Sequence, residues 1–200
     1  MSLEISLRLP GWVAEELGEP SRRFRSDEEK MELAVRLADR NVAEKTGGPF
    51  GACVFETETG RLVAPGVNLV VPAGCSVAHA EVMAIVLAQK ARGSFDLAAA
   101  EHEPMELFAS AQPCIQCYGA IWWSGLRRLV IGARGADVEA ATGFEEGLLP
   151  ERWQEHLERR TSLPPVEVRT DCLRDRALEP LRRYQVSGGL IYNPGSTAPE

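Results

Sequence analysis

Two short segments contain the residues whose types and spacing suit chemistry. In "SVAHAE", His79 stands two residues before Glu81, where a stretch of apolar residues at helical spacing begins. In "AQPCIQC", Cys114 and Cys117 are three residues apart at the start of another expected helix. This spacing puts both sulfur atoms on one side of the first turn, where the helix dipole favours thiolates. One imidazole and two thiolates are a typical ligand set for a catalytic zinc ion, whose fourth position stays open to water.

Glu81 supplies the second part of the predicted chemistry. In the middle of a helix, side chains at positions i and i+2 point in different directions. At the N-terminal end of a helix, the side chains of His79 and Glu81 can both point toward an ion that lies beyond that end. A carboxylate beside zinc-activated water can take its proton and later return it to a leaving group. We therefore predict that His79, Cys114 and Cys117 bind one zinc ion per subunit and that Glu81 moves the protons.

Each motif has a simpler interpretation when it is taken alone. A Cys-x-x-Cys pair is often a redox pair, a histidine near a helix start is usually a cap, and a glutamate there usually interacts with the helix dipole. A structural zinc site would need a fourth protein ligand, for which Cys53, Cys75 and Cys172 are candidates without informative spacing. The combination of His-x-Glu with Pro-Cys-x-x-Cys is much more specific and favours catalysis.

The composition is that of an ordinary globular protein. The chain has 200 residues, which suits one domain, and its 22 basic and 29 acidic residues give a net charge of −7. This charge disfavours binding to a nucleic acid. No apolar run reaches the roughly 20 residues of a membrane span, and Glu4 and Arg8 interrupt any signal peptide. We expect a cytoplasmic protein with reduced cysteines and no membrane partner.

The elements that must position the motifs alternate between helix and strand. Ser26 is the expected N-cap of a first long helix, with Glu29 completing a capping box. Pro113 is expected to open the helix that carries the two cysteines, and Pro180 to disturb the last helix. Apolar strands are expected at 52–56, 61–70, 105–110, 128–133 and 166–170.

This alternation predicts an α/β fold, a three-layer α/β/α sandwich with helices on both faces of one sheet. Residues 1–25 mix proline, glycine and charge, so we expect an N-terminal extension that lies over the surface. Residues 26–200 are expected to form the zinc-dependent domain, which includes the C-terminal helix and a tail without a helix or strand pattern.

With "HAE" and "PCIQC" in place, the chain resembles the cytidine deaminase superfamily over about residues 26–150, and the similarity extends toward the C-terminus. The resemblance implies a central five-stranded mixed sheet with zinc at the mouths of two facing helices. It also implies that His79, Cys114 and Cys117 bind zinc and that Glu81 shuttles protons in a hydrolytic deamination.

Other segments are similar to bacterial guanine deaminases. In "ATGFEEGLLP", the resemblance implies that Phe144 contacts the base and that Glu146 is a second catalytic carboxylate. In "GAIWWSG", Trp123 matches a base-site aromatic residue. In "GGLIYNPG", Tyr192 matches a tyrosine that approaches the active site of the neighbouring subunit. Because this chain is longer than compact members of the family, a C-terminus that packs on its own subunit would keep Tyr192 from that neighbour.

Two further segments complete the expected base site. "GGPFGACVFE" places Phe50 and the backbone of Ala52 beside the substrate, and "GVNLV" places Asn68, whose amide can donate and accept at a purine edge. The resemblance implies hydrolysis of the free base guanine to xanthine and ammonia, with Glu81 and Glu146 moving protons. A homodimer is expected by analogy alone.

Several other functions remain open from the sequence. A tRNA adenosine deaminase shares the zinc signature, although the net charge of −7 and the lack of a basic cluster near the chain end oppose it. Cytosine, a nucleoside or an aminotriazine are other possible substrates for the same chemistry. A non-catalytic zinc module would require a fourth protein ligand and would tolerate Glu81→Gln.

Overall fold

The chain folds around one five-stranded sheet with strand order β2-β1-β3-β4-β5. The computed structural model describes residues 3–193. Strand β1 pairs antiparallel with β2 and β3, whereas β3 with β4 and β4 with β5 pair parallel, so the sheet is mixed. The strands are β1 (Gly51–Glu56), β2 (Leu62–Val67), β3 (Met105–Ala111), β4 (Arg128–Ala133) and β5 (Glu167–Arg169).

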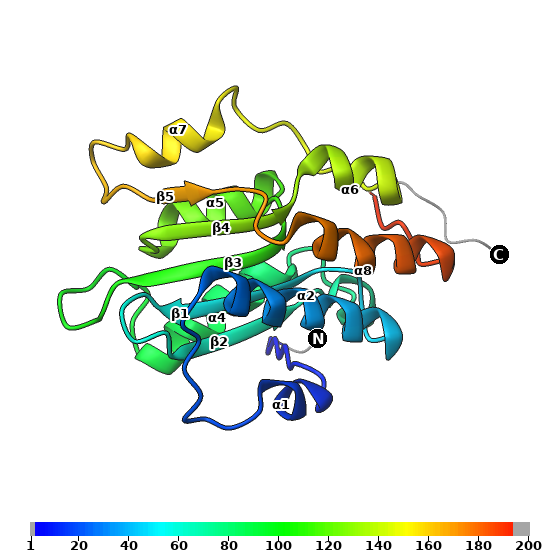
Figure 1. Ribbon diagram of the computed structural model, residues 1–200, viewed down its shortest axis with the longest axis horizontal. Coiled ribbons are helices and arrows are strands. Elements are labelled where there is room, and N and C mark those ends of the chain that lie inside the picture. Colours follow the sequence, from blue (N-terminus) through cyan, green and yellow to red (C-terminus); the bar gives the residue numbers. More distant parts are fainter. Residues whose placement is uncertain (1–2, 194–200) are drawn as a thin grey trace.

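Helices cover both faces of this sheet and make three layers (Figure 1). Helices α2 and α8 pack on one face with α6 against α8, while α4 and α5 share the other side. The predicted α/β sandwich with a five-stranded mixed sheet is confirmed. The helices are α1 (Trp12–Leu17), α2 (Asp27–Ala43), α3 (Val70–Ala73), α4 (Ala80–Arg92), α5 (Ile115–Ser124), α6 (Gly135–Thr142), α7 (Trp153–Glu158) and α8 (Arg174–Val186).

The two central strands form a rigid support for the site. Every residue of β1 and β3 is buried, as expected for strands covered on both faces. Phe55 and Phe108 on these strands meet edge to face, with ring centroids 5.6 Å apart. The carboxyl end of β3 leads directly into the cysteine segment, so the core fixes where that segment begins. The apolar residues expected at helical spacing on α2 are all buried: Met31, Leu33, Ala34, Leu37, Ala38 and Val42.

The N-terminal residues pack on the domain more closely than expected. Helix α1, which has no clear sequence pattern, contacts α2 and buries Val13. Phe24 is also buried and its ring lies 5.1 Å from that of Phe55. Residues 1–2 of the expected extension and residues 194–200 of the expected domain lie outside the described part of the chain.

Several helices and strands begin or end at other residues than expected, because the local backbone conformation sets these boundaries. Helix α5 begins at Ile115 and not at Pro113, because Cys114 is an extended N-cap with φ −69° and ψ 174°. The strand expected at 61–70 ends at Val67, and α3 follows it. Helix α8 continues through Pro180, which is buried. Within residues 3–193 no helix is both long and apolar enough to cross a bilayer.

Glu56, at the end of β1, is expected to make folding stability depend on pH. It forms ion pairs with Arg61 and Arg92, and hydrogen bonding from Arg61 lowers the pKa of Glu56 from 4.5 to about 2 despite its burial. When folding lowers the pKa of a carboxyl group, the group stabilises the folded state at every pH above its pKa in the unfolded chain. This stabilisation is lost as the pH falls from the unfolded-state pKa to the folded-state pKa. We expect the difference in free energy of unfolding between wild type and Glu56→Gln to shrink from about pH 4.5 to about pH 2. Urea unfolding at several pH values measures it, and a pH-independent difference would contradict the expectation.

Candidate active site

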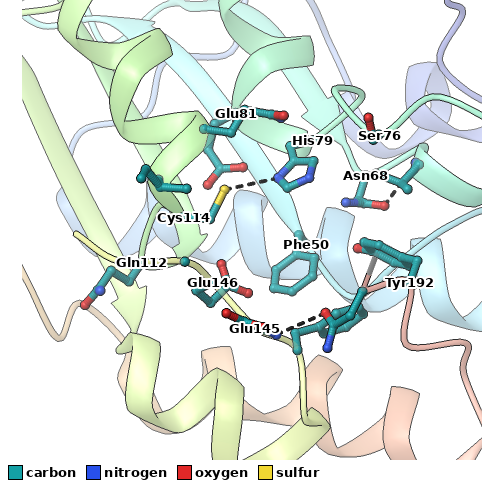
Figure 2. A pocket seen from close by; sticks show the side chains of 16 residues that line it. Phe50, Asn68, Ser76, His79, Glu81, Gln112, Cys114, Glu145, Glu146 and Tyr192 are labelled. Carbon is teal, nitrogen blue, oxygen red and sulfur yellow. Dashed lines mark hydrogen bonds between the residues drawn. The ribbon is translucent and has the colours of Figure 1, made fainter. Parts of the chain in front are cut away.

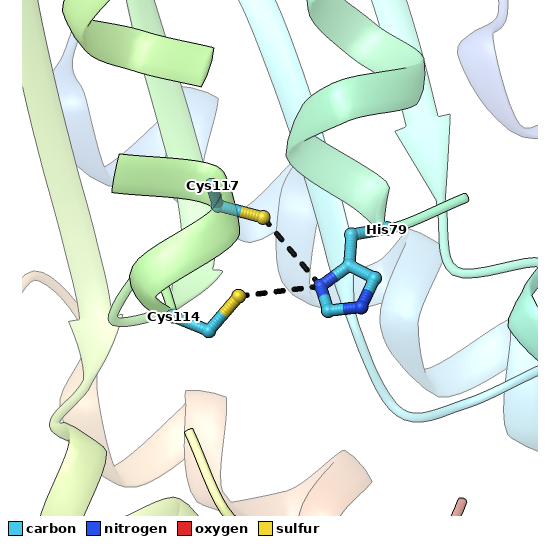
Figure 3. A group of neighbouring side chains, drawn as sticks. All are labelled: His79, Cys114 and Cys117. Carbon is cyan, nitrogen blue, oxygen red and sulfur yellow. Dashed lines mark hydrogen bonds between the residues drawn. The ribbon is translucent and has the colours of Figure 1, made fainter. Parts of the chain in front are cut away.

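His79 and two cysteines converge at the N-terminal ends of two helices (Figure 3). His79 is the N-cap of α4, Cys114 is the N-cap of α5, and Cys117 lies in the first turn of α5. Nδ1 of His79 lies 3.5 Å from the Sγ atom of each cysteine. The three donor atoms lie within 4.8 Å of one another, and no other histidine, cysteine or carboxylate of residues 3–193 joins them.

This donor set fits zinc. One imidazole nitrogen and two sulfurs are ligands that zinc prefers, and three protein ligands leave one coordination position free. A closed structural site would need a fourth ligand. The other cysteines do not belong to the group: Cys53 and Cys172 are buried elsewhere, and Cys75 is only partly buried.

The two thiols differ in acidity because they interact directly. Hydrogen bonding from the Cys117 thiol and from His79 lowers the pKa of Cys114 to about 4. The same contact with Cys114, together with burial, raises the pKa of Cys117 well above its ordinary value. Burial alone would lower the pKa of His79, but its hydrogen bond with Cys114 and the charge of Glu81 raise it. Cys114 is thus a thiolate at neutral pH, and metal binding must displace a proton from Cys117.

A cavity of about 440 Å³ opens beside the three ligands (Figure 2). This volume is in the range of small-molecule sites in proteins. Its walls come from the loop before β1, the segment after β2, the starts of α4 and α5, the loop after α6 and the C-terminal segment. Residues that line it are Phe50, Asn68, Val70, Ser76, His79, Glu81, Gln112, Cys114, Ile115, Phe144, Glu145, Glu146, Tyr192 and Asn193.

Two carboxylates in the cavity have pKa values near neutrality. Glu81 is 8% exposed, and burial followed by the negative charge of Cys114 raises its pKa to about 7. Burial, Cys114 and Glu81 raise the pKa of Glu146 to about 8. Groups that titrate near the working pH can both accept and return a proton, as acid–base catalysis requires.

Aromatic rings and one amide form the wall opposite the metal ligands. The ring of Phe144 lies 5.5 Å from that of Phe50 and 4.6 Å from that of Tyr192. Asn68 is fully buried, and its Oδ1 accepts from the amide nitrogen of Val70 at 3.2 Å. Its side chain lies beside the hydroxyl of Tyr192 and hydrogen-bonds with it, so these two polar groups meet at this wall.

The family model for the cytidine and deoxycytidylate deaminase zinc-binding region matches residues 24–133. This span contains all three metal ligands and Glu81. The chain belongs to the cytidine and deoxycytidylate deaminase family. It is therefore a zinc-dependent aminohydrolase, with His79, Cys114 and Cys117 positioned as the zinc ligands.

Relatives within this deaminase family include enzymes that act on different bases. The guanine deaminase of Bacillus subtilis is 34% identical over 131 residues, which are 66% of this chain and 79% of that protein. A solved structure of guanine deaminase from Nitrosomonas europaea is 42% identical, with a TM-score of 0.86 over 93% of this chain and 98% of that chain. A related structure at the same identity holds 8-azaguanine. A tRNA-specific adenosine deaminase of Haemophilus influenzae is 33% identical over 112 residues, which are 56% of this chain and 60% of that protein.

Two residues expected at the base site of this deaminase lie elsewhere. Ala52 is fully buried in the middle of the sheet, where it pairs with Gly66 on one side and Ala109 on the other. Trp123 is 75% exposed on the outer side of α5. Its side chain cannot reach the cavity of its own subunit, because the inner side of α5 is occupied by Cys117 and Ile121.

Tyr192 lines the cavity of its own subunit, so the expected approach to a neighbour's site is not what the structure shows. Burial raises the pKa of Tyr192 well above its ordinary value, which keeps the hydroxyl protonated. The neighbouring Asn193 was not expected in the site. Its side chain accepts from the amide nitrogen of Glu145 at 3.1 Å and donates to the carbonyl of Gly143 at 3.2 Å. Gln112, the residue before Pro113, also lines the cavity and was missed, although its place at the end of a buried strand indicated it.

Proposed function

We propose that this chain deaminates the free purine base guanine, giving xanthine and ammonia. The observation that carries the proposal is the second, partly buried carboxylate, Glu146, in the same cavity as Glu81 and the zinc ligands. Guanine deamination needs a proton at the ring nitrogen and another at the departing amine, so two titratable carboxylates suit it. The guanine deaminases among its relatives support the same substrate.

The residues divide the reaction between them. His79, Cys114 and Cys117 would hold a zinc ion, and when bound this ion would lower the pKa of a coordinated water molecule toward neutrality. Glu81 accepts a proton as this water attacks C2 of guanine, and delivers it to the adjacent ring nitrogen. Glu146 takes the proton of the new C2 hydroxyl and passes it to the amine as the C2–N bond breaks, so that C2 becomes a carbonyl. Water and guanine thus give xanthine and ammonia.

The opposite wall holds the base in place. Phe50 and Phe144 offer aromatic faces to a flat purine ring. Asn68 lines the cavity beside the hydroxyl of Tyr192, and its amide suits hydrogen bonding at the purine edge. Tyr192 lines the same cavity, and burial keeps its hydroxyl protonated.

A panel of substrates tests the proposal. Purified zinc-loaded protein is assayed for ammonia release from guanine, guanosine, adenine, cytosine and an aminotriazine, and for inosine formation in a tRNA transcript. We expect guanine to be the best substrate. The tRNA reaction is the second candidate, because tRNA-specific adenosine deaminases are relatives of this chain. Deamination of the transcript with no turnover of guanine would overturn the proposal in favour of that candidate.

We also propose that the protein is a homodimer that pairs through α4 and α5. These helices expose Trp123, Ile115 and Val86, which are 75%, 52% and 51% exposed. Apolar area of this kind stabilises association at about 25 cal/mol per Å² buried. We expect Trp123→Glu to convert the dimer to a monomer in size-exclusion chromatography with light scattering.

Val186→Glu is the matched control for this dimer prediction. Val186 is 84% exposed at the end of α8, in the opposite helical layer, so its replacement should leave the dimer intact. A wild-type monomer at micromolar concentration, or a dimer that survives Trp123→Glu, would count against pairing through α4 and α5.

The cytoplasm is the compartment we propose. All five cysteines are free thiols, and two of them belong to the zinc site. A Cys114–Cys117 disulfide would remove two of the three ligands, so the site needs a reducing environment.

A further inference from the structure

Asn41, near the C-terminal end of α2, lies beneath the base-binding wall without lining the cavity. Its side chain is fully buried. Nδ2 donates to the carbonyl of Gly48 at 2.8 Å and to the carbonyl of Asn68 at 2.9 Å, and Oδ1 accepts from the hydroxyl of Thr46 at 2.7 Å. Both donor hydrogens and the acceptor oxygen of this one amide are therefore used.

The two carbonyls that Asn41 binds belong to the segments that carry Phe50 and Asn68. The Gly48 carbonyl also accepts from the amide nitrogen of Phe50 at 2.9 Å, and the amide nitrogen of Asn68 donates to the Phe50 carbonyl at 3.1 Å. The segments approach closely, because a Cβ atom on Gly47 would lie 1.9 Å from the Asn68 carbonyl oxygen. Asn41 thus closes a small hydrogen-bonded unit that sets where the aromatic ring and the amide enter the cavity.

Thr46 fixes the orientation of the Asn41 amide and connects it to α1. The Thr46 hydroxyl has one proton, which it donates to Oδ1 of Asn41, and it accepts from Nε1 of Trp12 at 3.1 Å. Were the Asn41 amide rotated, its oxygen would face two carbonyl oxygens. Helix α1 is held on α2 by an ion pair between Glu16 and Arg36, at 2.7 Å.

We infer that Asn41 is a positioning residue for the base site and that the N-terminal helix α1 supports it through Trp12 and Thr46. The inference rests on the proposed function only in that Phe50 and Asn68 contact the base. It gives residues before Ser26 a role in substrate binding, although none of them lines the cavity.

The test uses variants that change this hydrogen-bonded chain without touching the cavity. Thr46→Val removes the hydroxyl at nearly constant volume, Thr46→Ser retains it, and Trp12→Phe removes the indole N–H but keeps an aromatic ring. Loss of one hydrogen bond that orders the binding wall is expected to raise KM about three- to tenfold. We expect this rise in Thr46→Val and a smaller one in Trp12→Phe, with kcat within about twofold of wild type because the lost interaction is uniform binding.

The controls separate positioning from general loss of stability. Thr46→Ser should restore the wild-type KM. Glu56→Gln, which breaks the ion pairs with Arg61 and Arg92 at the end of β1 and does not contact α1, should lower Tm without raising KM. Asn41→Leu should raise KM further, and Thr46→Val keeps the test valid if that buried variant does not fold. Equal KM values for Thr46→Val and Thr46→Ser, or an equal rise in Glu56→Gln, would overturn the inference.

A binding measurement distinguishes failure of this inference from failure of the proposed function. Calorimetric titration of zinc-loaded protein with 8-azaguanine requires no turnover. If wild type binds this analogue but does not release ammonia from guanine, the proposed function fails. The inference about Asn41 is then decided by the affinities of Thr46→Val and Thr46→Ser for the analogue. A dissociation constant that rises in Thr46→Val and recovers in Thr46→Ser supports it, and one that is unchanged in both contradicts it.

Discussion

Replacement of Glu81 by glutamine is expected to lower kcat for guanine deamination by about 10³-fold, within the range attributed to a positioned general acid–base group. Glutamine has nearly the same shape but cannot accept a proton. Glu81 is almost fully buried beside the zinc ligands, and its pKa of about 7 allows it to take and return a proton near neutral pH. The measurement is steady-state ammonia release at saturating guanine.

Two controls accompany this prediction. Glu81→Gln should keep the zinc content and Tm of wild type, which shows that only proton transfer is lost. Glu81→Asp keeps a carboxylate on a shorter side chain, so its kcat should lie between those of wild type and Glu81→Gln. A Glu81→Gln protein with full zinc and near wild-type kcat would assign proton transfer to another group.

Cys117→Ser is expected to remove both zinc and activity. Cys117 is fully buried at the start of α5, with its sulfur 3.5 Å from Nδ1 of His79. A serine hydroxyl does not ionise near neutral pH and is a poor zinc ligand, so only His79 and Cys114 would remain. We expect zinc to fall from about one ion per chain to near zero after dialysis, with guanine turnover falling at least about 10³-fold. Metal analysis and the ammonia assay measure the two effects.

Cys75→Ser is the matched control for the loss of zinc. Cys75 is a free, partly buried thiol that does not belong to the ligand group. Its replacement should leave zinc content and turnover near wild type. Full zinc occupancy in Cys117→Ser would contradict the assigned ligand set.

Two of the three metal ligands were predictable from the sequence, because helix geometry alone brings their side chains together. Residues three apart at a helix start must present their side chains together, so Cys114 and Cys117 were paired without any knowledge of the fold. That His79 meets them depends on two helices whose starts are brought together by the sheet. The sequence indicates this meeting only through the combination of His-x-Glu with Pro-Cys-x-x-Cys, and the structure confirms that the three side chains converge.

Trp123 shows that a matched motif position must still be placed by helix geometry, since this side chain does not line the cavity of its own subunit. Cys117 and Trp123 are six residues apart, and at about 100° per residue they leave α5 in different directions. Ile121, four residues after Cys117, shares its inward direction and is fully buried. Ala52 lies within β1, opposite Gly66 of β2 and Ala109 of β3, so the sheet encloses it and it does not line the cavity.

Features that depend on distant segments could not be predicted. Helix α1 is six residues long, too short for a periodic pattern, and its place is set by contacts with α2. The C-terminal segment returns to the cavity only because α8 directs it there, so the position of Tyr192 in its own subunit has no local signal. Asn41 looks like one polar residue in an apolar helix until the loops that it joins are seen together.

The central claim is that zinc and Glu81 direct water to C2 of guanine. It is tested most directly by mass spectrometry of the product formed from guanine in ¹⁸O-labelled water with zinc-loaded wild type. We predict xanthine that carries one labelled oxygen, one ammonia for each xanthine, and no product after zinc is removed. Failure to form xanthine, or unlabelled xanthine, would contradict the account.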